Sequence, residues 1–122
     1  MAAVEKIEDR TYKFALRIIR LVSALPKDYA SRAIGQQVLR SGTGIGANVE
    51  EAIGASTKKD FTNKMAIARK EARETHYWLR LLRDAEMMEA KRIEPLIQEA
   101  LEIKKILSKT VSTARKNLRV SI

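Results

Sequence analysis

The sequence predicts an all-α protein whose fold is an antiparallel, up-down-up-down four-helix bundle. Apolar residues recur at helical spacing in four segments, no stretch shows sustained alternation of apolar and polar residues, and the connections between segments are short. Short connections make successive helices antiparallel neighbours. The chain has 122 residues, which suits one domain, so we expect a single bundle over residues 1–122.

The first predicted helix covers about residues 9–24 and stops before Pro26. Its apolar residues fill two adjacent stripes and leave only a narrow basic strip of Lys13, Arg17 and Arg20. A helix that packs against one neighbour needs only one apolar stripe. The second stripe therefore predicts a further contact, which we expect another subunit to make.

The second predicted helix covers about residues 30–53 and contains Gly42, Gly44 and Gly46, with Gly54 as its stop. Each glycine inside a helix costs about 1 kcal/mol relative to alanine. The surrounding apolar residues nevertheless keep helical spacing. We therefore favour one continuous helix, with or without a kink, in which the glycines let a neighbouring helix approach closely, and a break within the glycine run is the alternative. The run does not match a nucleotide-binding loop, because helix rather than strand precedes it.

The third predicted helix covers about residues 57–85, with Ser56 or Thr57 as its N-cap. The fourth covers about residues 92–116. Residues 117–122 are expected to form a flexible tail.

The charge balance is the main functional clue. Lys and Arg total 24 and Asp and Glu total 15, which gives a net charge of +9 and a pI near 10.0. Residues 103–122 hold six of the cations and no acid. A basic surface attracts nucleic acid, because binding releases the counterions condensed on the phosphates. The alternative is a basic protein with no such ligand.

Cationic side chains recur at helical spacing on three of the predicted helices. Arginine forks suit bidentate contacts with phosphate, and a repeated spacing presents several of them at once. The alternative for each stripe is a solvated face partly neutralised by glutamates. On the third helix, the residues that share one face are Arg69, Arg73, His76, Arg80 and Arg83. The candidate nucleic-acid contacts are Arg17, Arg20, Arg69, Arg73, Arg80, Arg83, Lys105 and Lys109.

An aromatic pair, Tyr77 and Trp78, lies beside this stripe and could stack on bases. Aromatic pairs on helices more often lie in a core or a subunit interface, and we favour that interpretation. The cations are therefore the candidate contacts, and the aromatic pair is not.

The sequence does not indicate an enzyme. It contains no cysteine and one histidine, His76, and Arg73 rather than an acid stands three residues before it. Thiolate chemistry and a di-iron site are therefore excluded, and we expect no cofactor and no metal. A carboxylate nuclease that uses Mg²⁺ is the remaining catalytic alternative. The glutamates expected to pair with arginines within the bundle are Glu50, Glu51, Glu71 and Glu74.

Neither a membrane span nor a secretion signal is indicated. No window reaches about 18 uncharged apolar residues. Residues 1–10 carry acids early and lack an apolar core. We therefore expect a cytoplasmic protein.

Several motifs resemble those of a known family. The second predicted helix reads QVLRSGTGIGANVEEA over residues 37–52, and the third reads AIARKEA over 66–72 and ETHYWL over 74–79. These motifs resemble those of the four-helix-bundle proteins encoded in 23S ribosomal RNA intervening sequences, and the resemblance covers about residues 9–115. One departure is the glycine run, where relatives often carry Ala, Ser or Pro.

The resemblance implies a bacterial protein that forms a ring-shaped homo-oligomer, a pentamer. A similar fold is used by the accessory variability protein of diversity-generating retroelements, a basic pentamer that partners a reverse transcriptase and binds nucleic acid. From the resemblance and the basic stripes we expect a non-enzymatic, homo-oligomeric bundle that binds RNA or DNA without sequence specificity. The alternative is an assembly or adaptor protein that binds a partner such as a reverse transcriptase and has no direct nucleic-acid role.

Overall fold

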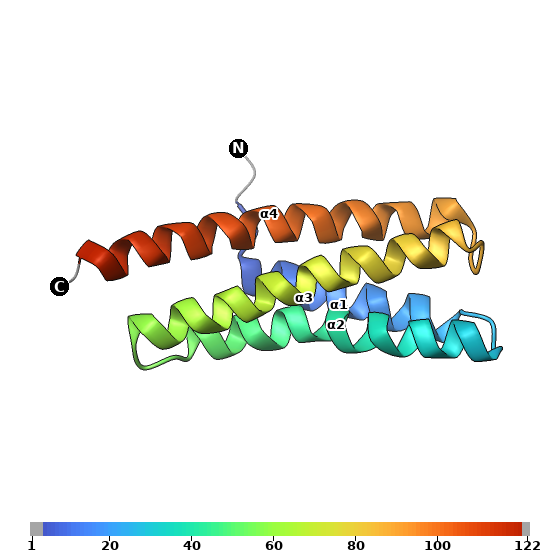
Figure 1. Cartoon of the computed structure of the whole chain (residues 1–122), viewed down its shortest axis with the longest axis horizontal. Coiled ribbons are helices and arrows are strands. Elements are labelled where there is room, and N and C mark those ends of the chain that lie inside the picture. Colours follow the sequence, from blue (N-terminus) through green and yellow to red (C-terminus); the bar gives the residue numbers. More distant parts are fainter. Residues whose placement is uncertain (1–3, 121–122) are drawn as a thin grey trace.

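A computed structural model describes residues 4–120 of the chain, and within this range it contains four α-helices and no strand. The all-α prediction is therefore confirmed. Figure 1 shows the helices lying lengthwise beside one another, with the chain turning back at each connection. The helices are α1 (Ile7–Ser23), α2 (Tyr29–Ile53), α3 (Lys58–Asp84) and α4 (Ala90–Val120).

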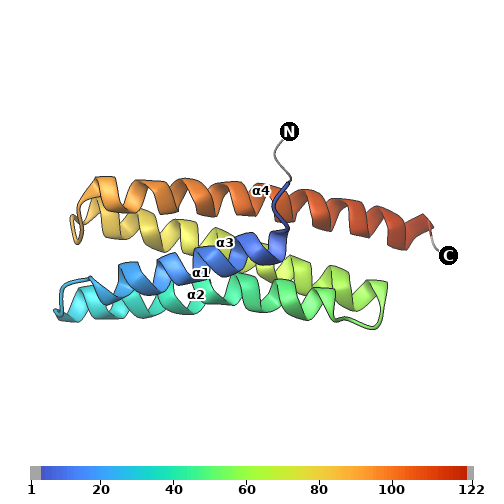
Figure 2. The ribbon, with the colours of Figure 1, turned by 180° about the vertical axis from the view of Figure 1, so that it is seen from behind.

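The helices differ in length, and this difference shapes the bundle. α1 has 17 residues, whereas α2 has 25, α3 has 27 and α4 has 31. α2 packs extensively on α3, and α3 on α4, whereas α1 lies mainly on α2 and meets α4 at few positions. Figures 1 and 2, viewed from opposite sides, show α1 and α3 on opposite faces, with α1 beginning near the middle of α4. Within residues 4–120, one end of the bundle is therefore built from α2, α3 and α4 without α1.

α2 is one continuous helix, so the break considered at its glycine run does not occur. The glycines lie where α1 approaches. A Cβ placed on Gly42 would lie 2.9 Å from two side-chain carbons of the fully buried Ile18, and one on Gly46 would lie 3.3 Å from Thr11 Oγ1. The predicted close approach of a neighbouring helix is confirmed, and the neighbour is α1.

Side-chain hydrogen bonds define the starts of α2 and α3. Asp28 accepts a hydrogen bond from the backbone N of Ser31 at 2.9 Å, and Thr57 accepts one from the backbone N of Asp60 at 3.0 Å. Of the two N-caps considered for α3, Thr57 is therefore the one in use.

α4 is longer than the sequence predicts. The flexible tail expected over 117–122 is instead helical to Val120, and residues 121–122 lie outside the described residues. No glycine or proline follows Val111, and Leu118, one heptad later, is half-buried. The inward stripe of α4 therefore continues past the expected stop.

α3 ends in a Schellman motif that lacks the usual glycine. The backbone N–H of Met87 donates to the carbonyl of Leu82, and that of Glu86 donates to the carbonyl of Arg83, both at 3.0 Å. Glu86 has φ 57°, in the left-handed region where glycine is usual. The turn from α3 to α4 therefore contains a strained residue.

Arg10 joins α1 to α4. Its Nε and Nη2 lie 2.8 and 2.7 Å from the two carboxylate oxygens of Glu99, and Nη2 also lies 2.8 Å from Glu102 Oε2. The guanidinium holds the pKa of the Glu99 carboxyl below its ordinary value. A bidentate, partly buried pair of this kind fixes the position of α1 along α4.

Candidate nucleic-acid interface

The five basic residues predicted on one face of α3 separate into two groups. Arg73 and Arg80 are exposed, whereas Arg69, His76 and Arg83 are half-buried. The half-buried residues recur every seven positions, and the last of them, Arg83, contacts Glu94 on α4. Intervals of 4 and 3 residues place side chains on a common face, but that face is wide enough to have one edge against a neighbouring helix.

Arg83 is neutralised by carboxylates. Its Nε lies 2.8 Å from Asp84 Oδ1, and its Nη1 lies 3.1 Å from Glu94 Oε1 on α4. Hydrogen bonds to Asp84 and Glu94 raise its pKa above the ordinary arginine value. A cation already bound to two acids is poorly placed to bind phosphate.

Arg73 and Arg80 lie in a hollow of about 520 Å³ on the outer side of α3, which we call the α3 hollow. Arg40 from α2 and Lys104 from α4 also line it. The sequence reasoning missed both, because a pattern along one helix does not show which cations its neighbours contribute. The sequence did contain one signal for Lys104. It lies seven residues from both Ile97 and Val111, which are buried, so it shares their face of α4. The other residues lining the α3 hollow are Glu74, His76, Tyr77 and Trp78.

Arg40 is partly neutralised within the α3 hollow. It lies 3.1 Å from Glu71 Oε2 and 2.6 Å from Glu74 Oε2. The predicted pairing of these two glutamates with an arginine is confirmed. The same prediction is wrong for Glu50 and Glu51, which are exposed on α2 and form no ion pair within the described part of the chain.

His76 lies in the α3 hollow close to positively charged side chains. Burial lowers its pKa, and the positive charges of Arg80 and Lys104 lower it further. The hollow is lined by four cations, Arg40, Arg73, Arg80 and Lys104, and by one carboxylate, Glu74, so it carries an excess of positive charge.

The aromatic pair beside these cations has two different environments. Trp78 is half-buried and packs against the core, whereas Tyr77 is exposed. The Arg80 guanidinium lies 5.8 Å from the centroid of the Tyr77 ring, and the two aromatic rings meet edge to face at 5.0 Å. The core interpretation holds for Trp78, while Tyr77 has a ring face near a cation on the surface.

A second cationic cluster lies between α1 and α4. Arg17 and Arg20 line a hollow of about 220 Å³ together with Arg92 from the first turn of α4. All three side chains are exposed. Arg92 was missed, because its nearness to α1 follows from the packing of two helices at the ends of the chain.

Lys105 and Lys109 are exposed on α4. Lys109 lies beside Ile106 in a hollow near the carboxyl end of α4, and Lys105 is not among the residues that line this hollow. Among the eight predicted contacts, the ones without an ion pair inside residues 4–120 are Arg17, Arg20, Arg69, Arg73, Arg80, Lys105 and Lys109.

Two other site types have no representative in the described residues. No group of three or more His, Asp or Glu side chains is placed there to hold a metal ion. No helix in that part of the chain combines the length and apolar character needed to cross a membrane.

These features define an all-α, four-helix bundle protein with clustered surface cations. The chain belongs to the family of 23S rRNA-intervening sequence proteins, whose pattern it matches over residues 5–109. It is also similar to a Bacteroides thetaiotaomicron protein of unknown function from the S23 ribosomal protein family, solved as a crystal structure at 1.70 Å. The two share 38% identity with a TM-score of 0.80, over 87% of this chain and 98% of that one. No curated protein matches this chain. The family resemblance inferred from the motifs is confirmed.

Proposed function

We propose that this protein binds RNA or DNA without sequence specificity, through phosphate contacts made by arginines and lysines on several faces of the bundle. The observation that carries the proposal is the set of exposed cations that have no carboxylate partner within residues 4–120. A phosphate chain supplies such cations with counter-charges and releases its own condensed ions. The proposal includes no catalytic step, metal or cofactor.

The spacing in the α3 hollow supports separate phosphate contacts. Arg73 and Arg80 are one heptad apart, about 10 Å along the helix. Each presents a planar fork that can bind one phosphate with two hydrogen bonds. Tyr77, exposed between them, offers a surface on which an unpaired base can stack.

The proposal extends to the assembly: antiparallel up-down-up-down bundles join as a homo-oligomeric ring, a pentamer by family resemblance, in the bacterial cytoplasm. An outward stripe on α1 supports it, since Tyr12, Leu16 and Ile19 are exposed at helical spacing. Contiguous exposed apolar surface marks interaction sites. A ring would repeat the cationic clusters around one particle and strengthen binding by multivalency.

The test is fluorescence anisotropy with a labelled single-stranded RNA and a labelled DNA duplex over a range of salt concentrations. We expect the affinity to fall by orders of magnitude between about 50 and 200 mM salt. Absence of binding at about 50 mM salt would refute the proposal. Light scattering after size exclusion tests the ring, and a monomeric mass would refute that part.

The alternative function is an adaptor that binds an acidic surface of a protein such as a reverse transcriptase, with no direct nucleic-acid role. The same unpaired cations favour it, because carboxylates and phosphates are both bound by arginine forks. A pull-down of the purified candidate partner that survives nuclease treatment, combined with absent RNA and DNA binding, would decide for the adaptor.

A further inference from the structure

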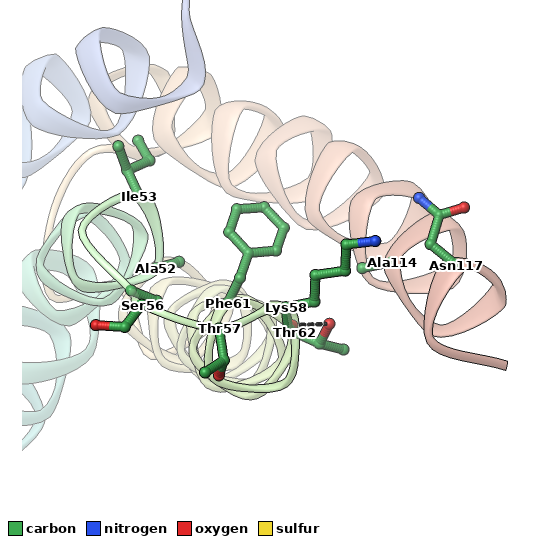
Figure 3. A pocket seen from close by; sticks show the side chains of 10 residues that line it. Ala52, Ile53, Ser56, Thr57, Lys58, Phe61, Thr62, Ala114 and Asn117 are labelled. Carbon is green, nitrogen blue, oxygen red and sulfur yellow. Dashed lines mark hydrogen bonds between the residues drawn. The ribbon is translucent and has the colours of Figure 1, made fainter. Parts of the chain in front are cut away.

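The end of the bundle that lacks α1 contains an apolar groove. Two adjoining hollows of about 520 and 410 Å³ share Phe61, Ala114 and Asn117. Figure 3 shows the Phe61 ring projecting into the space between the end of α2 and α4. We call this feature the end groove, and its main lining residues are Ile53, Phe61, Ile106, Lys109, Thr113 and Ala114.

The end groove continues the path along which α1 packs. α1 begins at Ile7, and Lys6 before it has extended backbone angles, φ −66° and ψ 143°. Near the start of α1, Arg10 binds two side chains of α4, Glu99 and Glu102. Adding one heptad to these two positions gives Ile106 and Lys109, which line the groove. The helix-binding face of α4 therefore extends beyond the point where α1 stops.

Apolar side chains in the groove are exposed because no helix covers them. Ile53 and Ile106 are exposed, and Phe61 is half-buried although its position on α3 points to the core. Thr113 and Ala114 have short side chains, which leave space between α4 and the Phe61 ring. Two adjoining hollows with exposed apolar side chains between neighbouring helices fit the apolar face of an amphipathic helix.

The end groove is basic, so a helix that binds in it is expected to have an acidic polar face. No acid lines either hollow, and every charged residue of α4 from residue 103 onward is a cation. Where α1 presents Arg10 to two glutamates, the next heptad presents an isoleucine and Lys109. The complementary helix therefore has an apolar residue opposite Ile106 and an acid beside Lys109.

We propose that the end groove binds an amphipathic helix of a partner protein, whose apolar stripe packs on Phe61 and Ile106 and whose acidic side pairs with Lys109. The helix occupies the position that α1 leaves open and completes a four-helix arrangement along the whole bundle. The site shares Lys109 with the candidate nucleic-acid contacts, whereas Phe61 and Ile106 belong to the groove alone.

The probe is a fluorescein-labelled peptide of about 18 residues, about five helical turns, with a Leu/Ala stripe and a Glu polar face. One control peptide has the same residues in scrambled order, and a second control peptide has Lys in place of every Glu. With the full chain at about 150 mM salt, anisotropy should show saturable binding of the acidic peptide at about 10–100 μM. Both controls should bind at least about ten-fold more weakly.

Two matched pairs of variants locate the binding. Ile106 and Ile67 are 37% and 40% exposed, so Ile106→Gln and Ile67→Gln are alike in chemistry and differ in place. Ile106→Gln should weaken acidic-peptide binding about five-fold or more, and Ile67→Gln should leave it unchanged. Lys109→Glu should weaken it about ten-fold and improve binding of the Lys peptide, whereas Lys105→Glu, one turn away, should do neither.

Four results would overturn the proposal. The first is equal binding of the acidic and scrambled peptides, and the second is equal effects within either variant pair. The third is a smaller assembly in light scattering for Ile106→Gln, which would assign the groove to a second copy of this chain. Loss of RNA binding in Ile106→Gln, with RNA competing against the peptide, would likewise assign the groove to nucleic acid. Absence of RNA binding in the unaltered protein leaves the proposal intact.

Discussion

Two glycines of α2 should respond in opposite ways to alanine. In a helix interior, alanine is favoured over glycine by about 1 kcal/mol. At Gly42 the new Cβ would lie 2.9 Å from two carbons of Ile18, which is branched at that point and fully buried, so α1 must shift. Such overpacking costs about 1–3 kcal/mol. Gly42→Ala should therefore lower the free energy of unfolding by about 1 kcal/mol.

At Gly44 the balance is reversed. The nearest atom to a new Cβ is a carboxylate oxygen of Glu71 at 3.2 Å, the far end of a flexible side chain. Moving it weakens the exposed contact with Arg40, which is worth at most about 1 kcal/mol. Gly44→Ala should leave stability unchanged or raise it by up to about 1 kcal/mol.

Thermal and urea unfolding followed by circular dichroism measure both variants. A separation of about 1–2 kcal/mol corresponds to about 4–8 °C in Tm for a domain of this size. On an Ile18→Ala background, the penalty of Gly42→Ala should shrink, because the clashing carbons are gone. If Gly42→Ala stabilises the protein as much as Gly44→Ala does, then Gly42 is not required for the close approach of α1, and this explanation of the glycine is wrong.

Three further predictions concern the turn, the cations and the pH dependence. Glu86→Gly should raise the free energy of unfolding by about 0.5–1 kcal/mol, because it removes left-handed strain; an unchanged or lower Tm would contradict this. Arg73→Gln should reduce the slope of log affinity for RNA against log salt by about 1, and Arg83→Gln, already bound to two acids, should leave the slope unchanged. Because Arg10 lowers the pKa of Glu99, the pair stabilises the protein above the ordinary carboxyl pKa, and this contribution is lost as pH falls through the depressed value. Urea titrations between about pH 7 and 3 should therefore show a smaller acid-induced loss of stability in Glu99→Gln, and an equal loss would rule out this pair as a source.

Local signals in the sequence correctly predicted the cap of α3 and the continuity of α2, because the residues that carry each signal also form the structure. Thr57 was one of the two predicted caps because Ser and Thr hydroxyls accept hydrogen bonds at helix N-termini, and it does cap α3. The continuity of α2 followed from helical spacing that persists through its glycines. The end of α4 was misjudged, because no residue marks a stop and the half-buried Leu118 extends the helix.

The surface was harder to predict, because its character depends on which helices become neighbours. The spacing of Arg73 and Arg80 placed them on one face, and both are exposed. The same spacing could not show that Arg83 meets Glu94 from α4, or that Lys104 joins the α3 hollow. These contacts join residues from different helices, so they follow from packing and leave no trace in a linear pattern.

The uneven packing of α1 also has a dynamic consequence. Since α1 packs mainly on α2 and meets α4 at few positions, the Arg10 cluster among them, it is the helix whose local opening breaks the fewest tertiary contacts. Its amides should exchange with deuterated water sooner than those of α3, which is sandwiched between two long partners. Transient departure of α1 would leave a trough running the full length of the remaining three helices, open to any chain able to take its place.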